Sequence, residues 1–416
     1  MPEPLPEARD IVVGAGVIGA AIAHAMQSRG RQVTLIDRHP PGMGASRGNL
    51  ASIAVSEFLP ASRPAVWRQV PGWLLNPSGP IALRTRYLPR LAPWLWRFLL
   101  AGRPARIQAL EAANAALCTR ALPDTRALLA ELGAETLLTD TGCLALYAGD
   151  AELHADRDHL TALTRHGVAH DRLTRAELTA LEPEIGPHIT AALRLPDNRS
   201  LTDPHRLVTL LVERFTALGG RLHRATVTGF ERAGGITAVR TEAETLPATT
   251  VTLAAGAFTA RLARMLAEPI PLATERGYHT QIMAPGIGLK HSLIWPARAF
   301  MVTPTAGGIR VGGTVEMAGL DAPPDWSRAK APLKHAQTAL PRLMAEDTSE
   351  WMGHRPALPD TIPILSASAR TPGLFHATGH GHLGVTQAAT TARLMAALIT
   401  GARPELDLAP YRVDRF

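Results

Sequence analysis

The chain has 416 residues, of which 46% are hydrophobic, and its formal net charge is +7. This length allows a large buried core and predicts two domains. The two cysteines, Cys118 and Cys143, are too few for a disulfide framework or a cysteine-rich zinc site. Nearly all of the basic residues are Arg, and no zinc-finger spacing, basic-helix pattern or RNA-binding signature accompanies them, so we expect no nucleic-acid partner.

The amino-terminal residues and the longest apolar stretches bear on the compartment. Residues 1–9 are rich in Pro and Glu and lack the basic and then apolar pattern of a secretion signal. No apolar stretch approaches the roughly 20 residues that a membrane-spanning helix needs. We therefore expect a cytoplasmic protein, with peripheral contact to the inner membrane as the alternative.

The first regular pattern is a β-branched run at 11–13, followed by a G-x-G-x-x-G sequence and an alanine-rich helical pattern. This order predicts a strand, a tight turn and a helix, the arrangement that binds dinucleotides. Gly14 permits the turn, Gly16 lets a pyrophosphate approach the backbone, and Gly19 lets the helix pack on the strand. The free N–H groups at the start of the helix favour phosphates. The predicted phosphate-binding segment is Gly14, Ala15, Gly16, Val17, Ile18 and Gly19.

A second strand is predicted at 32–36, and it ends at Asp37. An acid about 20 residues beyond the glycines accepts hydrogen bonds from the adenosine ribose hydroxyls. All parts of the dinucleotide-binding pattern therefore occur in order, and the alternative is a structural turn in an unrelated α/β fold. Small residues and hydroxyls fill 38–51, which lets this stretch pass close to a long, buried ligand such as a flavin dinucleotide. The residues expected beside the cofactor here are Arg38, Gly44, Ala45, Ser46, Asn49 and Leu50.

Residues 58–110 contain no Asp or Glu, but they contain eight Arg and four of the seven Trp. Aromatic anchors that alternate with cations suit the surface of an anionic membrane. The same composition fits a buried connection between domains whose arginines extend outward to solvent. Both interpretations stay open at this point.

The central part of the chain alternates between helices and strands. An amphipathic pattern at 104–133 predicts a helix that Pro123 divides in two, and a further helix is predicted at 204–220. Strands follow, and Val227, in the strand at 226–231, is expected beside the cofactor. The apolar run at 250–254 leads into Ala255 and Gly256, a turn of small residues that can also pass beside a cofactor.

Strand patterns dominate 275–355 and predict an antiparallel sheet. The last strand leads into a glycine-rich loop at 379–384 and a helix that starts near Thr386, so the positive end of the helix dipole can bind an anion or a polarised carbonyl. The residues expected at the cofactor are Gly381, His382, Leu383, Gly384, Val385 and Thr386. His380 and His382 have no acid or cysteine nearby, so we expect no metal.

Six segments of the sequence resemble the flavin-dependent D-amino-acid oxidase superfamily, and within it the bacterial D-amino-acid dehydrogenases. They are Ile11 to Gly19 with Asp37, Gly44 to Asn49, Leu253 to Gly256, Thr274 to His279, Gly353 to Asp360, and Gly379 to Gly384. Together they cover the chain in the order of the family.

The resemblance implies an α/β fold in which a Rossmann-like FAD-binding domain is interleaved with an α+β substrate domain that has a mainly antiparallel sheet. The FAD-binding domain is expected at 1–85, 187–274 and 356–416. The substrate domain is expected at 86–186 and 275–355. The resemblance also implies FAD, and we expect it to be non-covalent because neither cysteine falls in a tethering motif.

The resemblance further implies an amino acid as substrate and oxidation of its C–N bond. Arg355 matches the arginine that binds the substrate carboxylate in the family, a task to which a planar and permanently charged side chain is suited. Arg276 and Arg298 are alternatives. Tyr278, His279 and His382 are expected to line the substrate pocket.

Three functions are compatible with the sequence. The first is a FAD-dependent dehydrogenase of D-amino acids, including cyclic ones such as D-proline or hydroxy-D-proline, with a membrane quinone or another electron acceptor. The second is an amine oxidase of the glycine or sarcosine type that uses oxygen. Arg310 stands where sarcosine-type oxidases carry an oxygen-activating Lys, which favours the dehydrogenase. The third is a non-catalytic flavoprotein that carries electrons, against which the retained Arg355 argues.

Overall fold

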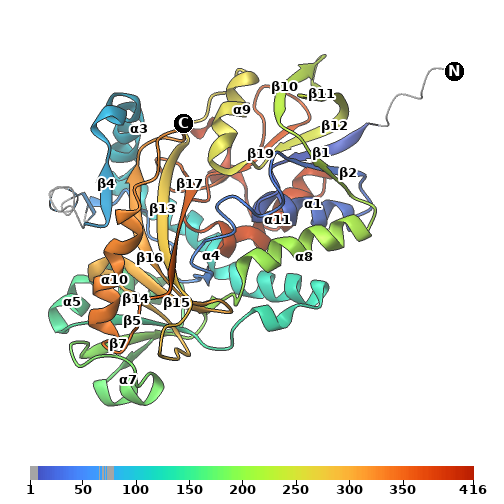
Figure 1. Cartoon of the computed structure of the whole chain (residues 1–416). Helices are drawn as coiled ribbons and strands as arrows, with labels where there is room; N and C mark the ends of the chain where they lie inside the picture. Colours follow the sequence, from blue (N-terminus) through green and yellow to red (C-terminus); the bar gives the residue numbers. More distant parts are fainter. Residues whose placement is uncertain (1–7, 65, 68–69, 71, 73–78) are drawn as a thin grey trace.

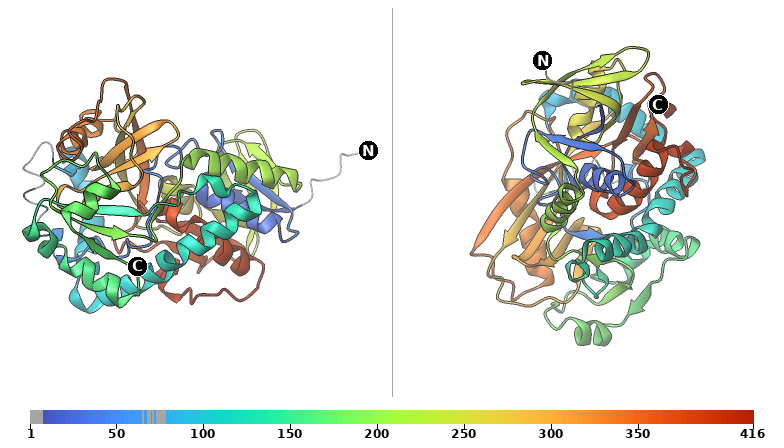
Figure 2. Two further views of the ribbon diagram at one scale, coloured as in Figure 1. Left: turned by 90° about the horizontal axis from the view of Figure 1, so that it is seen from below. Right: turned by 90° about the vertical axis from the view of Figure 1, so that its right-hand side faces the viewer.

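The computed structural model describes residues 8–64, 66–67, 70, 72 and 79–416. Two large sheets form the framework of the described chain, and the chain passes from one sheet to the other several times (Figure 1). Seen from below, the two sheets belong to separate lobes that meet along the middle of the molecule (Figure 2).

The first sheet has a parallel centre, in the order β9, β2, β1, β12 and β19, with β18 antiparallel at one edge. A hairpin, β10 and β11, extends it along the first half of β12. The bounds are β1 (Arg9–Val13), β2 (Val33–Asp37), β9 (Arg221–Arg224), β10 (Val227–Arg232), β11 (Ile236–Thr241), β12 (Thr245–Leu253), β18 (Ile364–Ala367) and β19 (Leu374–Thr378). Strands β1 and β12 are almost wholly buried where they pair, as apolar strands inside a parallel sheet must be.

Three helices, α1, α8 and α11, pack on one face of this sheet, and α4 packs on α11 and α8, so that all four share a common core with the sheet. Their bounds are α1 (Val17–Gln27), α4 (Pro104–Leu132), α8 (Pro204–Ala217) and α11 (Gly384–Ile399). The small residues of α1 and α11 let the two helices approach closely, and Ala20, Ala23 and Ala392 are buried between them and their neighbours. A short helix, α9 (Thr259–Met265), packs with the opposite core.

The prediction that Pro123 divides the helix at 104–133 is wrong, because α4 is continuous from Pro104 to Leu132 with Pro123 inside it. Proline removes one backbone hydrogen bond from a helix interior. Packing outweighs this loss, since Leu117 and Ala121 before the proline and Leu129 after it lie in the same buried core. Tertiary contacts therefore hold both halves on one axis.

The second sheet follows the order β17, β13, β16, β15, β14, β5, β7 and β6, with β4 beside β16. Among the described strands of this sheet, only the pairs β14–β5 and β16–β4 are parallel. The bounds are β4 (Ile81–Leu83), β5 (Cys143–Tyr147), β6 (Asp171–Leu173), β7 (Ala191–Leu195), β13 (Ala273–Ile282), β14 (Ser292–Trp295), β15 (Phe300–Thr305), β16 (Gly308–Met317) and β17 (Thr348–Ala357). The sheet is thus mainly antiparallel, as the sequence predicted.

The remaining described elements lie around the second sheet or between the sheets. Helix α10 packs on β16 and β13, and the pair β3–β8 lies near α11. Their bounds are α3 (Leu88–Ala101), α5 (Asp150–Ala155), α6 (Arg157–Arg165), α7 (Arg175–Leu181), α10 (Ser327–Ala339), β3 (Ser52–Ile53) and β8 (Arg199–Ser200).

The domain boundaries from the sequence stay a prediction. Strands β4, β7 and the first two residues of β13 pair within the second sheet, although they fall in the segments 1–85 and 187–274 that were assigned to the FAD-binding domain. Strand pairing across the chain decides sheet membership, and a local apolar pattern does not reveal the partner.

We predict that Gly19→Ala destabilises the fold and lowers cofactor retention. A Cβ at Gly19 would lie 1.8 Å from the carbonyl oxygen of Gly14, which is backbone and cannot turn away. The expected loss is about 3 kcal/mol, at the upper end for overpacking. Chemical denaturation and the bound-flavin absorbance measure it. Gly288→Ala, where a Cβ meets open space, is the matched control and should change neither quantity.

Candidate active site

The carboxyl ends of four neighbouring parallel strands meet at one edge of the first sheet. Strand β2 ends at Asp37, β1 leads into Gly14, β12 into Ala254 and β19 into Gly379. Ligands of open α/β sheets bind at such an edge. A cavity of about 1320 Å³ begins there and extends to the inner face of the second sheet.

The glycine-rich turn fits a dinucleotide because its backbone leaves no room for side chains. Gly14 has φ +111°, and a Cβ there would lie 2.5 Å from the carbonyl oxygen of Ala254. The N–H of Ala15 donates to Asp37 Oδ2 at 2.7 Å, and the N–H of Val17 donates to Ser46 Oγ at 2.9 Å. The turn, the terminal acid and the loop at 38–51 are therefore in direct contact.

The structure brings together every cofactor residue predicted from the sequence. All of them line the cavity except Gly19, which packs behind the turn. The guanidinium carbon of Arg38 lies 4.2 Å from the ring centre of Phe258, which orients this side chain beside Asp37. Their individual roles toward the cofactor stay predictions.

The start of α11 presents its first backbone N–H groups to the same cavity. The helix has no side-chain cap, and Gly384, Val385 and Thr386 line the cavity. The Thr386 hydroxyl donates to the Ser52 carbonyl and accepts from the Ala54 N–H, both at 3.1 Å, which fixes the helix against β3. This end of the helix dipole can stabilise negative charge that develops on a bound ring.

Strand alternation divides the residues of β13 between two faces of the second sheet. Glu275, Gly277 and His279 lie on the inner face and line the cavity. Arg276 and Tyr278 carry their side chains on the outer face, where both bond to Glu316.

Arg355 lies on β17, directly opposite Glu275 of β13. Its guanidinium occupies the space above Gly277, where a Cβ would come within 2.5 Å of it. Among the described residues this side chain has no hydrogen bond or ion pair, although it lines the cavity. Burial lowers the pKa of Arg355, and the nearby Glu275 carboxylate opposes that shift. A half-buried cation that lines a cavity without a hydrogen bond or ion pair from the described residues favours a bound anion.

His279 is neutral and held in one orientation. Its Nδ1 lies 2.7 Å from the Gly48 carbonyl oxygen and must donate, which leaves Nε2 as an acceptor. Its ring stacks on Trp351 with the centres 5.2 Å apart. Burial lowers the pKa of His279 to about 4, and the Arg310 and Arg355 cations add to the shift.

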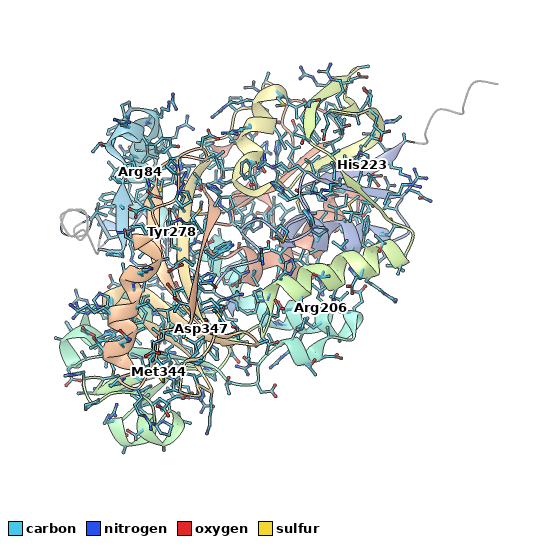
Figure 3. The ribbon with its side chains drawn as sticks, in the orientation of Figure 1. Arg84, Arg206, His223, Tyr278, Met344 and Asp347 are labelled. Carbon is cyan, nitrogen blue, oxygen red and sulfur yellow. The ribbon has the colours of Figure 1, made fainter. Side chains whose placement is uncertain are left out.

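Tyr278 borders the cavity, but its hydroxyl is used on the outer face. It donates to Glu316 Oε2 at 2.5 Å and accepts from the Asp325 N–H at 3.1 Å. Burial and the Glu316 contact raise the pKa of Tyr278. Arg84 joins the same carboxylate from the segment before α3, and Figure 3 shows Arg84 and Tyr278 on the same side of the molecule. This cluster connects α3 to the back of the sheet.

The other predicted side chains have distinct surroundings. His382 opens onto the cavity, and burial lowers its pKa. His380 bonds to the Thr391 hydroxyl, and burial lowers its pKa to about 3. Arg276 is fully buried in outer-face contacts, and Arg298 is exposed and stacks on Trp295. Of the three candidate arginines, only Arg355 lines the cavity. The described residues contain no group of three or more His, Cys, Asp or Glu that could hold a metal.

Three acidic residues that line the cavity, Glu275, Glu57 and Asp156, were not assigned from the sequence. Glu275 belongs to the Thr274–His279 segment, and alternation along that strand could have placed it on the face of His279. Glu57 also lines the cavity, and its carboxylate opposes the lowering of the His382 pKa that burial causes. It is the last acid before the acid-free segment 58–110, but no local pattern indicated its role.

The family of the chain follows from comparison with known proteins. Residues 11–398 match the family described as DAO, FAD dependent oxidoreductase. The chain is 35% identical over 422 residues to a D-amino-acid oxidase of Bradyrhizobium diazoefficiens, covering 99% of this chain and 100% of the relative. It is 30% identical over 423 residues to a D-amino acid dehydrogenase of Paramagnetospirillum magneticum, covering 98% of each. The chain belongs to the DAO family of FAD-dependent oxidoreductases, and FAD is its cofactor.

Solved structures confirm the predicted fold class. The glycine oxidase of Geobacillus kaustophilus superimposes with a TM-score of 0.78 at 21% identity, covering 98% of each chain. The L-proline dehydrogenase of P. horikoshii superimposes with a TM-score of 0.76 at 18% identity, covering 99% of this chain and 98% of the other.

We predict that His279 makes the fold acid-sensitive between pH 6.5 and pH 4. The unfolded imidazole takes up a proton in this range and the folded one does not, so stability falls as the pH falls. At pH 5 the loss is about 2 kcal/mol for this residue. Denaturation at pH 7.5 and pH 5 should show a smaller difference for His279→Gln than for the wild type. A change of the exposed His188 to Gln should leave the wild-type difference.

Proposed function

We propose that the chain oxidises D-amino acids, including cyclic ones, to imino acids that water converts to 2-oxo acids where the imine is not cyclic. The curated relatives that carry D-amino acid names support the substrate class. The single observation that carries the proposal is the unpartnered Arg355 guanidinium in the cavity, on the inner sheet face that adjoins the start of α11.

Each cavity group then has a defined task. Arg355 binds the substrate carboxylate with two parallel hydrogen bonds, as a planar guanidinium does. His279, neutral and fixed by Gly48, limits the position of the substrate without adding charge. A bound FAD would supply the acceptor for the hydride that leaves the substrate Cα, and the first N–H groups of α11 would stabilise the negative charge that this transfer creates.

We infer that FAD is held without a covalent bond. The thiol of Cys118 is buried, contacts the Glu57 carbonyl oxygen and has its pKa raised to about 12 by burial. Cys143 borders the cavity, and burial likewise raises its pKa to about 12. A protonated thiol is a poor nucleophile, so neither cysteine is suited to attack a flavin.

The electron acceptor is proposed to be a quinone or another acceptor in place of oxygen. Arg310, at the position noted for sarcosine-type oxidases, donates to the Asn49 carbonyl at 2.7 Å and to Gln281 at 2.9 Å. It therefore supports the loop at 38–51 from behind. The alternative is an oxidase of the glycine type, which the relative named an oxidase favours.

A membrane acceptor would need a docking surface, and we propose the outer side of α3. Trp94 of this helix is buried and donates to the Ala357 carbonyl at 3.2 Å, so this side closes the cavity. Trp96 does not line the cavity and is 62% exposed, and Arg90 and Arg97 of the same helix are also exposed. Arg68 and Trp73 of the 58–110 segment lie outside the described residues. No helix of the described residues is long and apolar enough to cross a membrane.

We predict that Arg355→Ala lowers kcat/KM by about 100-fold or more while FAD content stays unchanged, because a bidentate charged contact is lost. Arg355→Lys should recover part of the activity, since a point charge does not reproduce the fork. D-Amino acids with a dye acceptor provide the assay, with oxygen uptake measured in parallel. Arg298→Ala is the control; if it, and not Arg355→Ala, abolishes turnover, the carboxylate anchor is Arg298.

We predict that the protein sediments with anionic liposomes at low salt and that binding weakens as salt is added. Changing Arg90, Arg97 and Arg103 to Gln should reduce binding by roughly 100-fold, at about 1 kcal/mol for each cation near the surface. The same change at the exposed Arg29, Arg126 and Arg214, which lie in the turn after α1, on α4 and on α8, should reduce it much less. Equal recovery with anionic and neutral liposomes would contradict the docking surface.

A further inference from the structure

We propose that Glu275 is a second charged anchor of the same site and binds the substrate's α-ammonium group. This inference rests on the proposed function, since it assumes an amino acid held at Arg355. Glu275 and Arg355 form a direct cross-strand pair of β13 and β17, and both line the cavity. The pair would therefore hold the two charged groups of one zwitterion.

The two side chains are neighbours of opposite charge that do not pair with each other. Opposite charges on directly facing residues of an antiparallel pair normally attract across about 5 Å between their Cβ atoms. Here the Arg355 guanidinium lies over Gly277, one alternate position further along β13. Among the described residues neither side chain has an ion pair or a hydrogen bond. The gap between them leaves each charge open to a ligand.

The other candidates for the ammonium are less suitable. His279 is neutral and its Nδ1 is used by Gly48. Asp156 also lines the cavity, but its Oδ2 accepts from the Tyr147 hydroxyl at 2.7 Å and lies 3.2 Å from His159 Nδ1, so this oxygen is already engaged. Glu57 lines the cavity but lies on the loop after β3, outside the strand pair that carries Arg355. Glu275, by contrast, lies directly opposite Arg355 in the register of β13 and β17.

Two anchors fix more of the substrate than one. When Arg355 alone holds the carboxylate, the rest of the substrate can rotate about the bond between the carboxylate and Cα. When the ammonium is held as well, this rotation is blocked and the orientation of Cα is set. A ligand that has only a carboxylate would leave Glu275 unpaired beside a second negative charge. The site should therefore prefer zwitterions to simple carboxylates of the same shape.

The test compares two ligands that cannot react. 2-Aminoisobutyrate has the ammonium and the carboxylate but no hydrogen on Cα, and isobutyrate lacks the ammonium. Their dissociation constants for the FAD-loaded enzyme are measured from the perturbation of the flavin absorbance. We expect Glu275→Gln to weaken 2-aminoisobutyrate by about 10- to 100-fold, the effect of one lost charge-assisted contact. Isobutyrate should bind equally well or more tightly, because a nearby negative charge is gone.

Two further variants separate the possible outcomes. Glu57→Gln removes another carboxylate of the cavity and should change neither affinity by more than about threefold. Glu275→Asp keeps the charge and should retain part of the preference for the zwitterion. This variant allows the two affinities to be compared even if Glu275→Gln does not retain FAD. Equal weakening of both ligands by Glu275→Gln, or a lost preference in Glu57→Gln alone, would overturn the assignment.

The same titrations distinguish this inference from the proposed function. Arg355→Ala should weaken isobutyrate and 2-aminoisobutyrate alike. If Arg355→Ala leaves isobutyrate binding intact, the carboxylate anchor of the proposed function fails, whatever Glu275→Gln does. If Arg355→Ala behaves as expected and Glu275→Gln spares the zwitterion, only the ammonium anchor fails.

Discussion

The site depends on the meeting of four backbone turns at one edge of a parallel sheet. Because β2, β1, β12 and β19 are parallel neighbours, the chain leaves all four at the same edge. The turns can come this close only where side chains are absent, and Gly14 lies against the Ala254 carbonyl with no space for a Cβ. The resulting hollow is lined by backbone N–H groups and the start of α11, which favours a ligand with phosphates at one end and a polarised ring at the other.

The second sheet closes this hollow and supplies charged groups. The register of β13 and β17 brings Arg355, Glu275 and Gly277 together on the inner face, while the outer face satisfies its own charges through Glu316. The two faces differ in whether their charged groups are paired, and this difference indicates function because charges removed from water are normally paired. The outer cluster serves the fold, whereas the inner face carries unpartnered charge in the position where a ligand would be held.

Helix α3, in the 58–110 segment, has two distinct sides, one that closes the cavity and one that is exposed. Trp94 is buried, stacks on Phe98 and closes the cavity, as a connecting segment between sheets would. Trp96, two residues later, is among the most exposed large apolar side chains of the described chain. Two tryptophans that look equivalent in the sequence therefore lie on opposite sides of one helix, one buried and one exposed.

The sequence by itself determined the dinucleotide turn, its acid at Asp37, the glycine-rich loop before α11 and the family, because these features are local and their spacing is set by backbone geometry. The tertiary structure decided what depends on partners distant in the chain. Packing kept α4 continuous through Pro123, and strand pairing chose Arg355 over Arg276 and Arg298 as the arginine in the cavity. Pairing also turned the hydroxyl of Tyr278 away from the cavity and placed Glu275 beside Arg355. A residue type limits what a side chain can do, but only the register of strands far apart in sequence decides which side chains meet.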